Sequence, residues 1–444
     1  MKPRFQVRTG HTSQRIAGES LNLERHGAPA EFSVTLLTGG SDKPYVHGLS
    51  QALGSVGMKL DVIGSDELDE PALRNMPTVT FLNLRRDQRP DAKFIAKISR
   101  ILAYYCRLIR YAAASKPRIF HILWNNRFET FDRTVLMLYY KLLGKAVVLT
   151  AHNVNGAKRD HRDTSLNRLT LRVQYRLADH VFVHTPKMKT AIVKEFGVSS
   201  DRVTVIPFGI NNSIPATSLS SRQAKESLGL QEIQKTILFF GRIKPYKGVE
   251  YLIKAFQRLA LHHQEYRLII AGKLEEGCET YWHSIQREIQ GYVDTGRIRL
   301  RIEFIPDSDT ELYFKAADVL VLPYREIFQS GVIFLGYHFG LPVLAADVGS
   351  LKDDVVEGAT GFTFRTEDPA DLATAIERYF ASDLFADLGN QRKKIQEFAA
   401  KHHSWDTVSE ATVKVYSVLF RRAEPVGVRN SQSKTSSPSA EISE

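Results

Sequence analysis

Short apolar, β-branched runs alternate with stretches of helical spacing along most of the chain. In the first half the apolar runs occupy residues 32–38, 59–65, 78–84, 118–124, 146–152, 180–186 and 203–209, with helical patterns such as 96–115 and 133–144 between them. The alternation restarts with apolar runs at 236–241, 266–272, 299–306, 319–324 and 342–347 and helical patterns at 249–263, 332–340 and 371–382. Near-continuous apolar strands that alternate with helices are typical of parallel sheets covered on both faces. The pattern therefore predicts an α/β chain with two tandem Rossmann-like domains.

A stretch rich in Asn, Ser, Pro and Thr at residues 208–223 separates the two patterns and is typical of a connection. The expected organisation is a flexible arm at 1–30, an N-terminal domain at 31–212, a linker at 213–235, a C-terminal domain at 236–403, a helix at 404–423 that crosses back to the N-terminal domain, and a disordered tail at 424–444. Open parallel sheets bind ligands at the carboxyl ends of their strands, so the central cleft between the domains is the expected site.

Composition excludes several classes of protein. Of the 444 residues 43% are hydrophobic and 25% charged, which supplies a large core and excludes a mainly disordered chain. No run of about 18 apolar residues occurs, and residues 1–20 have no apolar segment, so we expect neither a membrane span nor a secretory signal. Cys106 and Cys278 are too few for a disulfide framework or a four-cysteine metal site, and they favour a reducing, cytoplasmic location.

Positive charge is concentrated in the first half. Residues 1–212 hold 32 Lys and Arg against 18 Asp and Glu, a net +14, whereas the remainder nets −3. A basic half favours an anionic partner, which would be a phosphorylated substrate, an acidic membrane surface or nucleic acid. A solvated basic surface without a partner is the alternative. The helical run 95–115 mixes basic and aromatic residues, and it fits either a helix lying on a membrane or a core helix with a basic outer face.

The loop after the apolar run 236–241 places two cations five residues apart, Arg242 and Lys247, before a helix that opens near Gly248. Arg holds phosphate oxygens bidentately, Lys adds a point charge, and a helix start offers free N–H groups. The Walker A spacing is absent. The loop therefore indicates an anion site, with ordinary surface cations as the alternative.

A second loop leads from the apolar run 319–324 to a helix start at Gly331. Ser330 suits the N-cap, and Gly331 lets a ligand approach the backbone. We predict a second anion pocket at Gln329, Ser330 and Gly331, with helix capping alone as the alternative.

These segments and their order resemble retaining glycosyltransferases of family 4, which have the GT-B fold. FGRIKPYKG at 240–248, GLPVLAADVGS at 340–350 and EGATGF at 357–362 match that family's motifs, as do TGG at 38–40 and LTAHNVN at 149–155. The resemblance implies transfer of a sugar, of hexosyl type, from a nucleotide-diphosphate-sugar to a saccharide, glycolipid or lipid-phosphate acceptor. Anomeric configuration would be retained, without a metal or another cofactor.

The resemblance also implies roles for individual residues. The catalytic set would be His152, Arg242, Lys247 and Glu326. The donor-binding set would be Gly39, Gly40, Arg242, Lys247, Gln329, Ser330, Gly331 and Val332. The acceptor-binding set, in the basic N-terminal domain, would be His121, Lys158 and Arg159. A membrane-bound acceptor would place the chain on the inner, anionic face of the cell membrane.

The chain departs from the family where a pair of glutamates is usual. Ile327 and Leu335 occupy their places, and Glu326 is one residue away from the first. An Asp-x-Asp pair at Asp307 and Asp309 mimics a metal-binding motif, but it immediately precedes a helical run and is expected to favour the helix start electrostatically.

Three other interpretations stay open. The missing glutamates fit a catalytically degenerate relative that binds nucleotide-sugars and acts as a scaffold or regulator. A pI of 9.4 fits a nucleic-acid-binding protein, although no such motif occurs and we expect no nucleic acid. A two-domain nucleotide-sugar epimerase of similar fold is the third.

Overall fold

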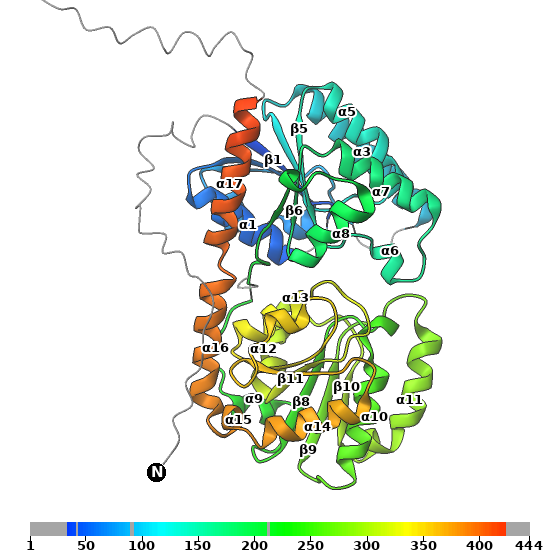
Figure 1. The fold of residues 1–444 in the computed structure, drawn as a ribbon, viewed down its shortest axis with the longest axis vertical. Coiled ribbons are helices and arrows are strands. Elements are labelled where there is room, and N and C mark those ends of the chain that lie inside the picture. Colours follow the sequence, from blue (N-terminus) through cyan, green and yellow to red (C-terminus); the bar gives the residue numbers. More distant parts are fainter. Residues whose placement is uncertain (1–32, 41–42, 89–92, 211–213, 423–444) are drawn as a thin grey trace, which may run out of the picture.

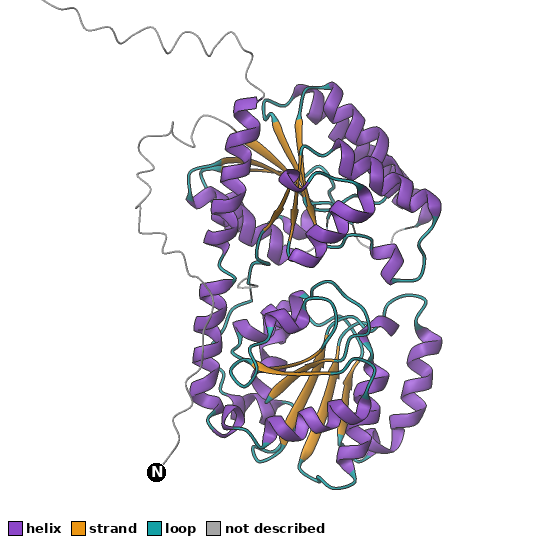
Figure 2. Cartoon of the chain, viewed as in Figure 1, coloured by secondary structure: helices purple, strands orange, loops and turns teal. Residues whose placement is uncertain are grey.

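Two parallel sheets, one in each half of the chain, organise the computed structural model (Figures 1 and 2). It describes residues 33–40, 43–88, 93–210 and 214–422, so the predicted arm 1–30 and tail 424–444 lie outside the described residues. The N-terminal sheet has the order β3-β2-β1-β4-β5-β6-β7 and the C-terminal sheet β10-β9-β8-β11-β12-β13. All pairings are parallel. The predicted fold class is confirmed.

The strands follow the apolar runs of the sequence. They are β1 Ser33–Leu37, β2 Lys59–Ile63, β3 Val79–Leu82, β4 Ile119–Ile122, β5 Ala146–Ala151, β6 His180–Val183, β7 Val203–Val205, β8 Lys235–Phe240, β9 Tyr266–Ala271, β10 Ile298–Arg301, β11 Val319–Leu322, β12 Val343–Ala346 and β13 Gly361–Phe364. Every residue of the inner strands β4, β6, β11 and β12 is buried. Burial on both faces explains why these strands are continuous apolar runs rather than alternating ones.

The helices cover both faces of each sheet. In the N-terminal half they are α1 Lys43–Ser55, α2 Pro71–Arg74, α3 Phe94–Ala114, α4 Glu129–Phe131, the π-helical turn η4 Asp132–Leu136, α5 Met137–Leu142, α6 Gly156–Arg159, α7 Ser165–Leu177 and α8 Pro186–Phe196. In the C-terminal half they are α9 Ser221–Ser227, α10 Val249–Ala260, α11 Glu279–Asp294, α12 Asp307–Ala316, α13 Gly331–His338, α14 Pro369–Phe380, α15 Asp383–Ala386, α16 Leu388–His402 and α17 Trp405–Arg422. Short 3-10 turns are η3 Asp66–Leu68, η5 Ser200–Arg202, η6 Pro245–Lys247 and η7 Leu351–Asp354.

The N-terminal sheet has a separate core on each face. One is built with α1 and α17, and the other with α3, α5, α7 and α8. The C-terminal sheet and its helices share one continuous core. Both sheets therefore stand as rigid platforms for the loops at their strand ends.

The last helix, α17, returns to the N-terminal domain and packs beside α1 (Figure 1). Trp405 at its start is buried and donates from Nε1 to the Ile210 carbonyl at 2.9 Å. A Cβ on Gly48 or Gly209 would lie within 2.5 Å of the Trp405 ring, so the indole fits only because both neighbours are glycine. Tyr416, further along α17, forms a 2.5 Å hydrogen bond with His121 of β4.

The stretch expected as a linker contains a short helix, α9. Its start is a capping box in which Ser220 Oγ accepts from the Gln223 amide at 3.2 Å while Gln223 Oε1 accepts from the Ser220 amide at 3.0 Å. The segment is also tied to α12, because the Thr217 amide donates to Glu311 at 2.7 Å. Part of the connection therefore belongs structurally to the C-terminal domain.

Candidate functional site

A cavity of about 350 Å³ lies between the two domains, at the carboxyl ends of their strands. The C-terminal domain lines it with the η6 turn after β8 and the start of α13 after β11. The N-terminal domain adds Tyr45 from α1 and Arg159 from α6, and Trp405 of α17 closes one side. This is the cleft that the two-domain pattern predicts.

Lys247 is the buried cation of this cavity. It ends the η6 turn, where Gly248 takes a left-handed conformation with φ of 65° and a Cβ would meet the Pro323 carbonyl oxygen at 2.0 Å. Lys247 Nζ donates to Tyr324 Oη at 2.6 Å and lies 4.1 Å from the centre of that ring. The tight turn thus fixes both the backbone and the ammonium group.

Burial, and then the neighbouring cations Arg159, Lys244 and Arg242, lower the pKa of Lys247 to about 7. The ammonium is therefore only partly populated at neutral pH. A phosphate beside it would restore its charge, because an opposite charge at close range favours the charged form.

The start of α13 forms the second part of the cavity wall. Ser330 is the N-cap, and its Oγ accepts from the Val332 amide at 3.4 Å. Tyr324 Oη also lies 3.3 Å from Ser330 Oγ, so one phenol joins the lysine to the helix cap. The α13 N-terminus and Lys247 thus form one anion-binding wall.

Gln329 lies directly before this cap. Its Nε2 donates to Asp354 Oδ2 at 3.3 Å, whereas its Oε1 is buried without a hydrogen-bond partner among the described residues. Burial raises the pKa of Asp354 to about 7. The amide oxygen is therefore free to accept from a ligand.

Arg159 brings a cation from the opposite domain. Its guanidinium lies 4.3 Å from the Tyr246 ring centre and donates to Asp160 at 2.7 and 3.1 Å. A stacked, carboxylate-paired guanidinium is held in one orientation, toward the cavity that Lys247 also lines. Arg159, which the sequence analysis predicts to bind the acceptor, thus lines the interdomain cavity.

His152 sits at the end of β5, on the N-terminal side. Its ring stacks on Trp124 with centroids 4.0 Å apart, and its Nδ1 lies 3.1 Å from His184 Nε2. Its Nε2 is buried and has no hydrogen-bond partner among the described residues. Burial, and then the neighbouring His184, hold the pKa of His152 well below its usual value, so the imidazole is neutral at physiological pH.

His152 is connected to the interdomain cavity through Tyr45, whose ring packs edge-on against it at 4.7 Å. Gly39 lies against the chain at Trp124: a Cβ there would be 2.6 Å from both the Cβ and the carbonyl oxygen of Trp124. Gly40 packs in the same way against the Arg85 guanidinium at 2.8 Å. In this structure Gly39 makes room for the neighbouring backbone and Gly40 for the Arg85 side chain.

Other residues singled out in the sequence lie apart from this cavity. Arg242 is exposed and pairs with Glu275 at 3.4 Å. Glu326 is exposed and borders a neighbouring cavity of about 220 Å³ together with Lys158. His121 is 1% exposed, and its two ring nitrogens bond Tyr416 and Thr150 at 2.5 and 2.7 Å, so it is not presented to an acceptor.

The places of the usual glutamates are apolar and buried. Ile327 and Leu335 are 8% and 7% exposed, and both border the interdomain cavity. Asp307 and Asp309 lie in the first turn of α12, where acidic residues favour the helix dipole. Among the described residues no group of three or more His, Cys, Asp or Glu is placed to hold a metal ion.

Sequence analysis missed Tyr324 and Tyr45. The available signal for Tyr324 was its position directly after the apolar run 319–322 and Pro323, at a strand end that faces the cleft. Tyr45 gave no such signal, because a tyrosine early in a helix is ordinary in any amphipathic pattern.

Family profiles match both halves of the chain. The profile described as Glycosyl transferases group 1 matches residues 234–382, and that described as Glycosyltransferase Family 4 matches residues 43–213. The chain belongs to glycosyltransferase family 4, a retaining family. The resemblance drawn from the motifs is confirmed.

Two curated relatives illustrate the similarity of this family 4 chain. A D-inositol 3-phosphate glycosyltransferase of Corynebacterium diphtheriae is 28% identical over 291 residues, which is 61% of this chain and 64% of the relative. An uncharacterized glycosyltransferase of Methanocaldococcus jannaschii is 27% identical over 253 residues, 54% of this chain and 60% of the relative. The matched region thus spans less than two thirds of these relatives.

Solved structures show the same GT-B fold. Sucrose-phosphate synthase from Thermosynechococcus elongatus superposes with a TM-score of 0.69 at 20% identity and covers 88% of this chain and all of that one, 100%. Anabaena Alr3699/HepE in complex with UDP-glucose gives 0.65 at 17% identity, with 87% and 99% covered. At these identities the likeness concerns the fold.

Proposed function

We propose that this family 4 protein transfers a hexosyl group from a nucleotide-diphosphate-sugar to an acceptor hydroxyl, with retention at the anomeric carbon. One observation carries the proposal: buried Lys247, the capped start of α13 and Arg159 of the opposite domain converge on one interdomain cavity. A diphosphate is the part of the donor that such a set of groups stabilises.

The proposed reaction assigns the bonds as follows. The acceptor oxygen bonds to the anomeric carbon, and the bond from that carbon to the β-phosphate oxygen breaks with its electron pair on the nucleoside diphosphate. The acceptor proton passes to a phosphate oxygen. Lys247 and the α13 amides stabilise the growing phosphate charge, and neutral His152 offers its free Nε2 to a sugar hydroxyl. We propose that these groups act without a metal ion.

UDP is the proposed nucleotide. Anabaena Alr3699/HepE, which shares the fold, is described in complex with UDP-glucose. The test is thermal unfolding of the purified chain with UDP, GDP or ADP, each with and without EDTA. Ligand at 100 times its dissociation constant adds about 2.7 kcal/mol of stability. A shift with UDP that EDTA leaves unchanged supports the donor and the metal-free site, and no shift with any nucleotide contradicts the proposal.

A degenerate relative is the second candidate, favoured by the apolar Ile327 and Leu335 in the cavity wall. Such a protein would bind the nucleotide but neither transfer nor hydrolyse its sugar. Incubation with UDP-glucose and measurement of released UDP separates the two candidates. Release of UDP contradicts the degenerate one.

For the location we propose that the N-terminal domain docks on an anionic membrane from the cytoplasmic side. The outward face of α3 is apolar along its length: Ile95, Ile98, Leu102 and Ile109 are exposed at helical spacing. Val135, Leu138 and Leu142 continue this face on η4 and α5. Tyr139 Oη of α5 donates to the Ile109 carbonyl of α3 at 3.1 Å, so the two helices adjoin, as Figure 1 shows.

Charge favours a lipid surface over a second copy of the chain as the partner of this apolar face. The sequence of α3 has four basic residues, Lys97, Arg100, Arg107 and Arg110, and no acidic one. Arg100 pairs with Asp87 at 3.5 Å and Arg107 donates to the Leu84 carbonyl at 2.8 Å. A second copy would set the remaining cations against its own, whereas anionic lipids attract a cation near their surface by about 1 kcal/mol. No helix among the described residues is long and apolar enough to cross a membrane.

Sedimentation with vesicles tests this docking. We expect the chain to sediment with phosphatidylglycerol-containing vesicles but not with pure phosphatidylcholine. Leu102→Gln with Leu138→Gln should release it, whereas Leu261→Gln, an exposed leucine of the other domain, should not. Equal binding of all variants contradicts the assigned face.

A further inference from the structure

A cavity of about 530 Å³ lies at the amino ends of β5, β6 and β7, at the edge of the N-terminal sheet opposite to the interdomain cleft. Lys145, Asp179 and Arg202, which directly precede these three strands, line it together with the last turns of α5, α7 and α17. Figure 1 shows α17 ending on the side of the N-terminal domain that is remote from the C-terminal domain. The length of the sheet therefore separates this amino-end cavity from the cleft.

Positive charge dominates the lining of the amino-end cavity. Its basic residues are Lys141, Lys145, Arg176, Arg202 and Arg422, and Asp179 is the one carboxylate among its lining residues. Asp179 is already paired, because Lys141 Nζ donates to its two oxygens at 2.7 and 2.6 Å and the Val147 amide donates to it at 2.7 Å. The other four cations have no carboxylate partner within the cavity.

Helix C-termini attract cations, but two of the cations here already serve that purpose. Arg202 Nη2 donates to the Arg176 carbonyl at 3.0 Å and to the Ala178 carbonyl, at the end of α7. Lys145 Nζ donates to the Ser115 carbonyl at 2.7 Å, at the end of α3. These carbonyl groups are therefore bonded without the two arginines that remain.

Those two arginines, Arg176 and Arg422, present unused guanidinium groups. Both are exposed, and the side chain of neither forms a hydrogen bond or an ion pair within the part of the chain that the structure describes. The positive potential is felt at His180, the first residue of β6, where burial, and then Arg202 among other cations, lower the pKa to about 4. A guanidinium binds phosphate oxygens bidentately, so the cavity offers two free phosphate-binding groups beside two fixed cations.

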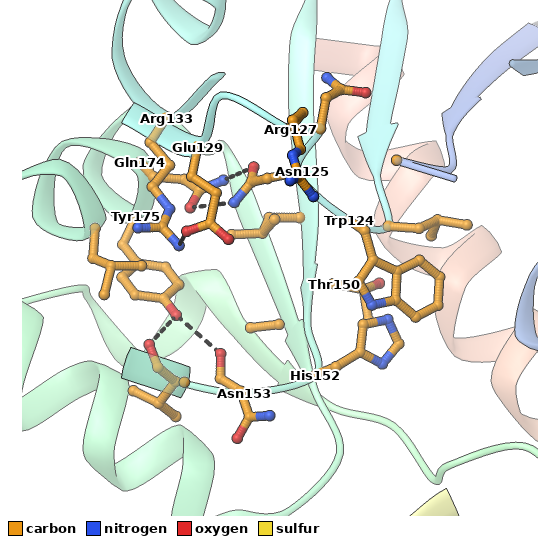
Figure 3. A pocket seen from close by; sticks show the side chains of 18 of the residues that line it. Trp124, Asn125, Arg127, Glu129, Arg133, Thr150, His152, Asn153, Gln174 and Tyr175 are labelled. Carbon is orange, nitrogen blue, oxygen red and sulfur yellow. Dashed lines mark hydrogen bonds and ion pairs between the residues drawn. The ribbon is translucent and has the colours of Figure 1, made fainter. Parts of the chain in front are cut away.

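The rest of the lining narrows the class of ligand. The remaining lining residues are Gly144, Ala146, Leu177 and Leu419, so the cavity has neither an aromatic ring nor a carboxamide among the residues that line it. The cavity of about 600 Å³ in Figure 3, at the carboxyl ends of β4 and β5, has both, in Trp124, Tyr175, Asn125 and Gln174. Bases stack on aromatic rings, and amides both donate to and accept from sugar hydroxyls. The amino-end cavity is thus suited to charge, and not to a base or a sugar.

We infer that the amino-end cavity is a binding site for a compact polyphosphate, a ligand with several linked phosphate groups and neither base nor sugar. Arg176 and Arg422 hold phosphate oxygens from the open side, while Lys145 and Arg202 supply fixed positive charge from the wall. The volume is that of a small-molecule site. The inference is independent of the proposed transfer, because the site lies at the other edge of the sheet. A bound polyphosphate joins the end of α17 to the turns before β6 and β7, so it should also raise the melting temperature.

Calorimetry with tripolyphosphate tests the inference. The full chain is used as the Lys247→Met variant, which removes the buried cation of the interdomain cavity and so separates the two sites. We expect tripolyphosphate to bind at one site, at least about tenfold more tightly than inorganic phosphate, and ATP to bind no more tightly than tripolyphosphate. Equal affinity for phosphate and tripolyphosphate, or tighter binding of ATP, would overturn the assigned class of ligand. Loss of all binding in Lys247→Met would place the polyphosphate in the interdomain cavity and overturn the assigned site.

Variants in the same background locate the binding. Arg176→Gln and Arg422→Gln each remove a charge that no described residue pairs with, and each should weaken tripolyphosphate about tenfold. Lys59→Gln is the matched control, because this exposed lysine begins β2 at the amino edge of the same sheet and does not line the cavity. It should leave the affinity unchanged. An equal effect of all three substitutions, or of none, would show only general attraction to a basic domain and contradict the inference.

Discussion

The two walls of the interdomain cleft are formed by different kinds of groups. The C-terminal wall consists of tight turns, a capped helix start and a single lysine with a buried phenol beneath it. The N-terminal wall presents side chains, among them the ring of Tyr45 and the guanidinium of Arg159. Backbone groups suit a ligand that is the same in every donor, such as a diphosphate. Side chains can be replaced one by one, which suits a ligand that differs from one protein to another. The difference explains why the sequence motifs are strong on one side and weak on the other.

The largest expected effect comes from removing the central cation of the C-terminal wall. Lys247→Ala should lower kcat by roughly 100-fold or more, since one preorganised donor to a developing oxyanion is worth about 3 kcal/mol. The measurement is UDP release from UDP-glucose with acceptor present. Lys254→Ala, an exposed lysine of α10, is the control. Near-normal turnover in Lys247→Ala would mean that the phosphate wall lies elsewhere.

A smaller effect is expected from the loss of Arg159, the cation that the N-terminal domain contributes to the cleft. Arg159→Gln keeps a polar side chain but loses the stacked charge on Tyr246, and we expect about 30-fold weaker UDP binding, or about 2 kcal/mol. Lys194→Gln on α8 tests whether any lost cation of this domain has the same effect. If Arg159→Gln instead changes only the KM for the acceptor, then Arg159 binds the acceptor, as the sequence analysis predicts.

The lowered pKa of Lys247, in the C-terminal wall, predicts that the affinity for UDP depends on pH. The free site loses its proton near pH 7 and bound phosphate raises that pKa, so UDP affinity should fall about tenfold from pH 7 to pH 8 or somewhat above. Calorimetry in buffers of different ionisation enthalpy would show proton uptake on binding. In Lys247→Met, the control, the pH dependence should vanish.

The same pKa predicts the direction in which the free energy of unfolding changes with pH. Between pH 7 and the usual lysine value of 10.5 the unfolded chain binds more protons than the folded one, so stability should rise with pH over that window. Lys247→Met should remove this rise. A lysine of normal pKa in the folded protein would abolish both effects.

How much of this architecture the sequence reveals depends on whether the signal is local. The two sheets, Lys247 and the Ser330 cap follow from apolar runs and the loop residues directly after them. Arg159 contacts Tyr246 of the other domain, and no spacing along the chain predicts a contact of that kind. His121 resembled a site residue at a strand end, yet its partner Tyr416 is 295 residues away.

The smallest predicted effect concerns Tyr324, the residue that joins the lysine to the helix cap. Tyr324→Phe keeps the ring under Lys247 but removes the oxygen that lies 2.6 Å from Nζ and 3.3 Å from Ser330 Oγ. We expect about fivefold lower kcat, roughly 1 kcal/mol, together with a further fall in the pKa of Lys247, so that the pH profile of UDP binding moves to lower pH. A merely structural tyrosine would lower stability and leave that profile in place. Since Phe retains the packing, a shifted profile with unchanged melting temperature would show that one hydroxyl tunes the pKa of the cation in the C-terminal wall.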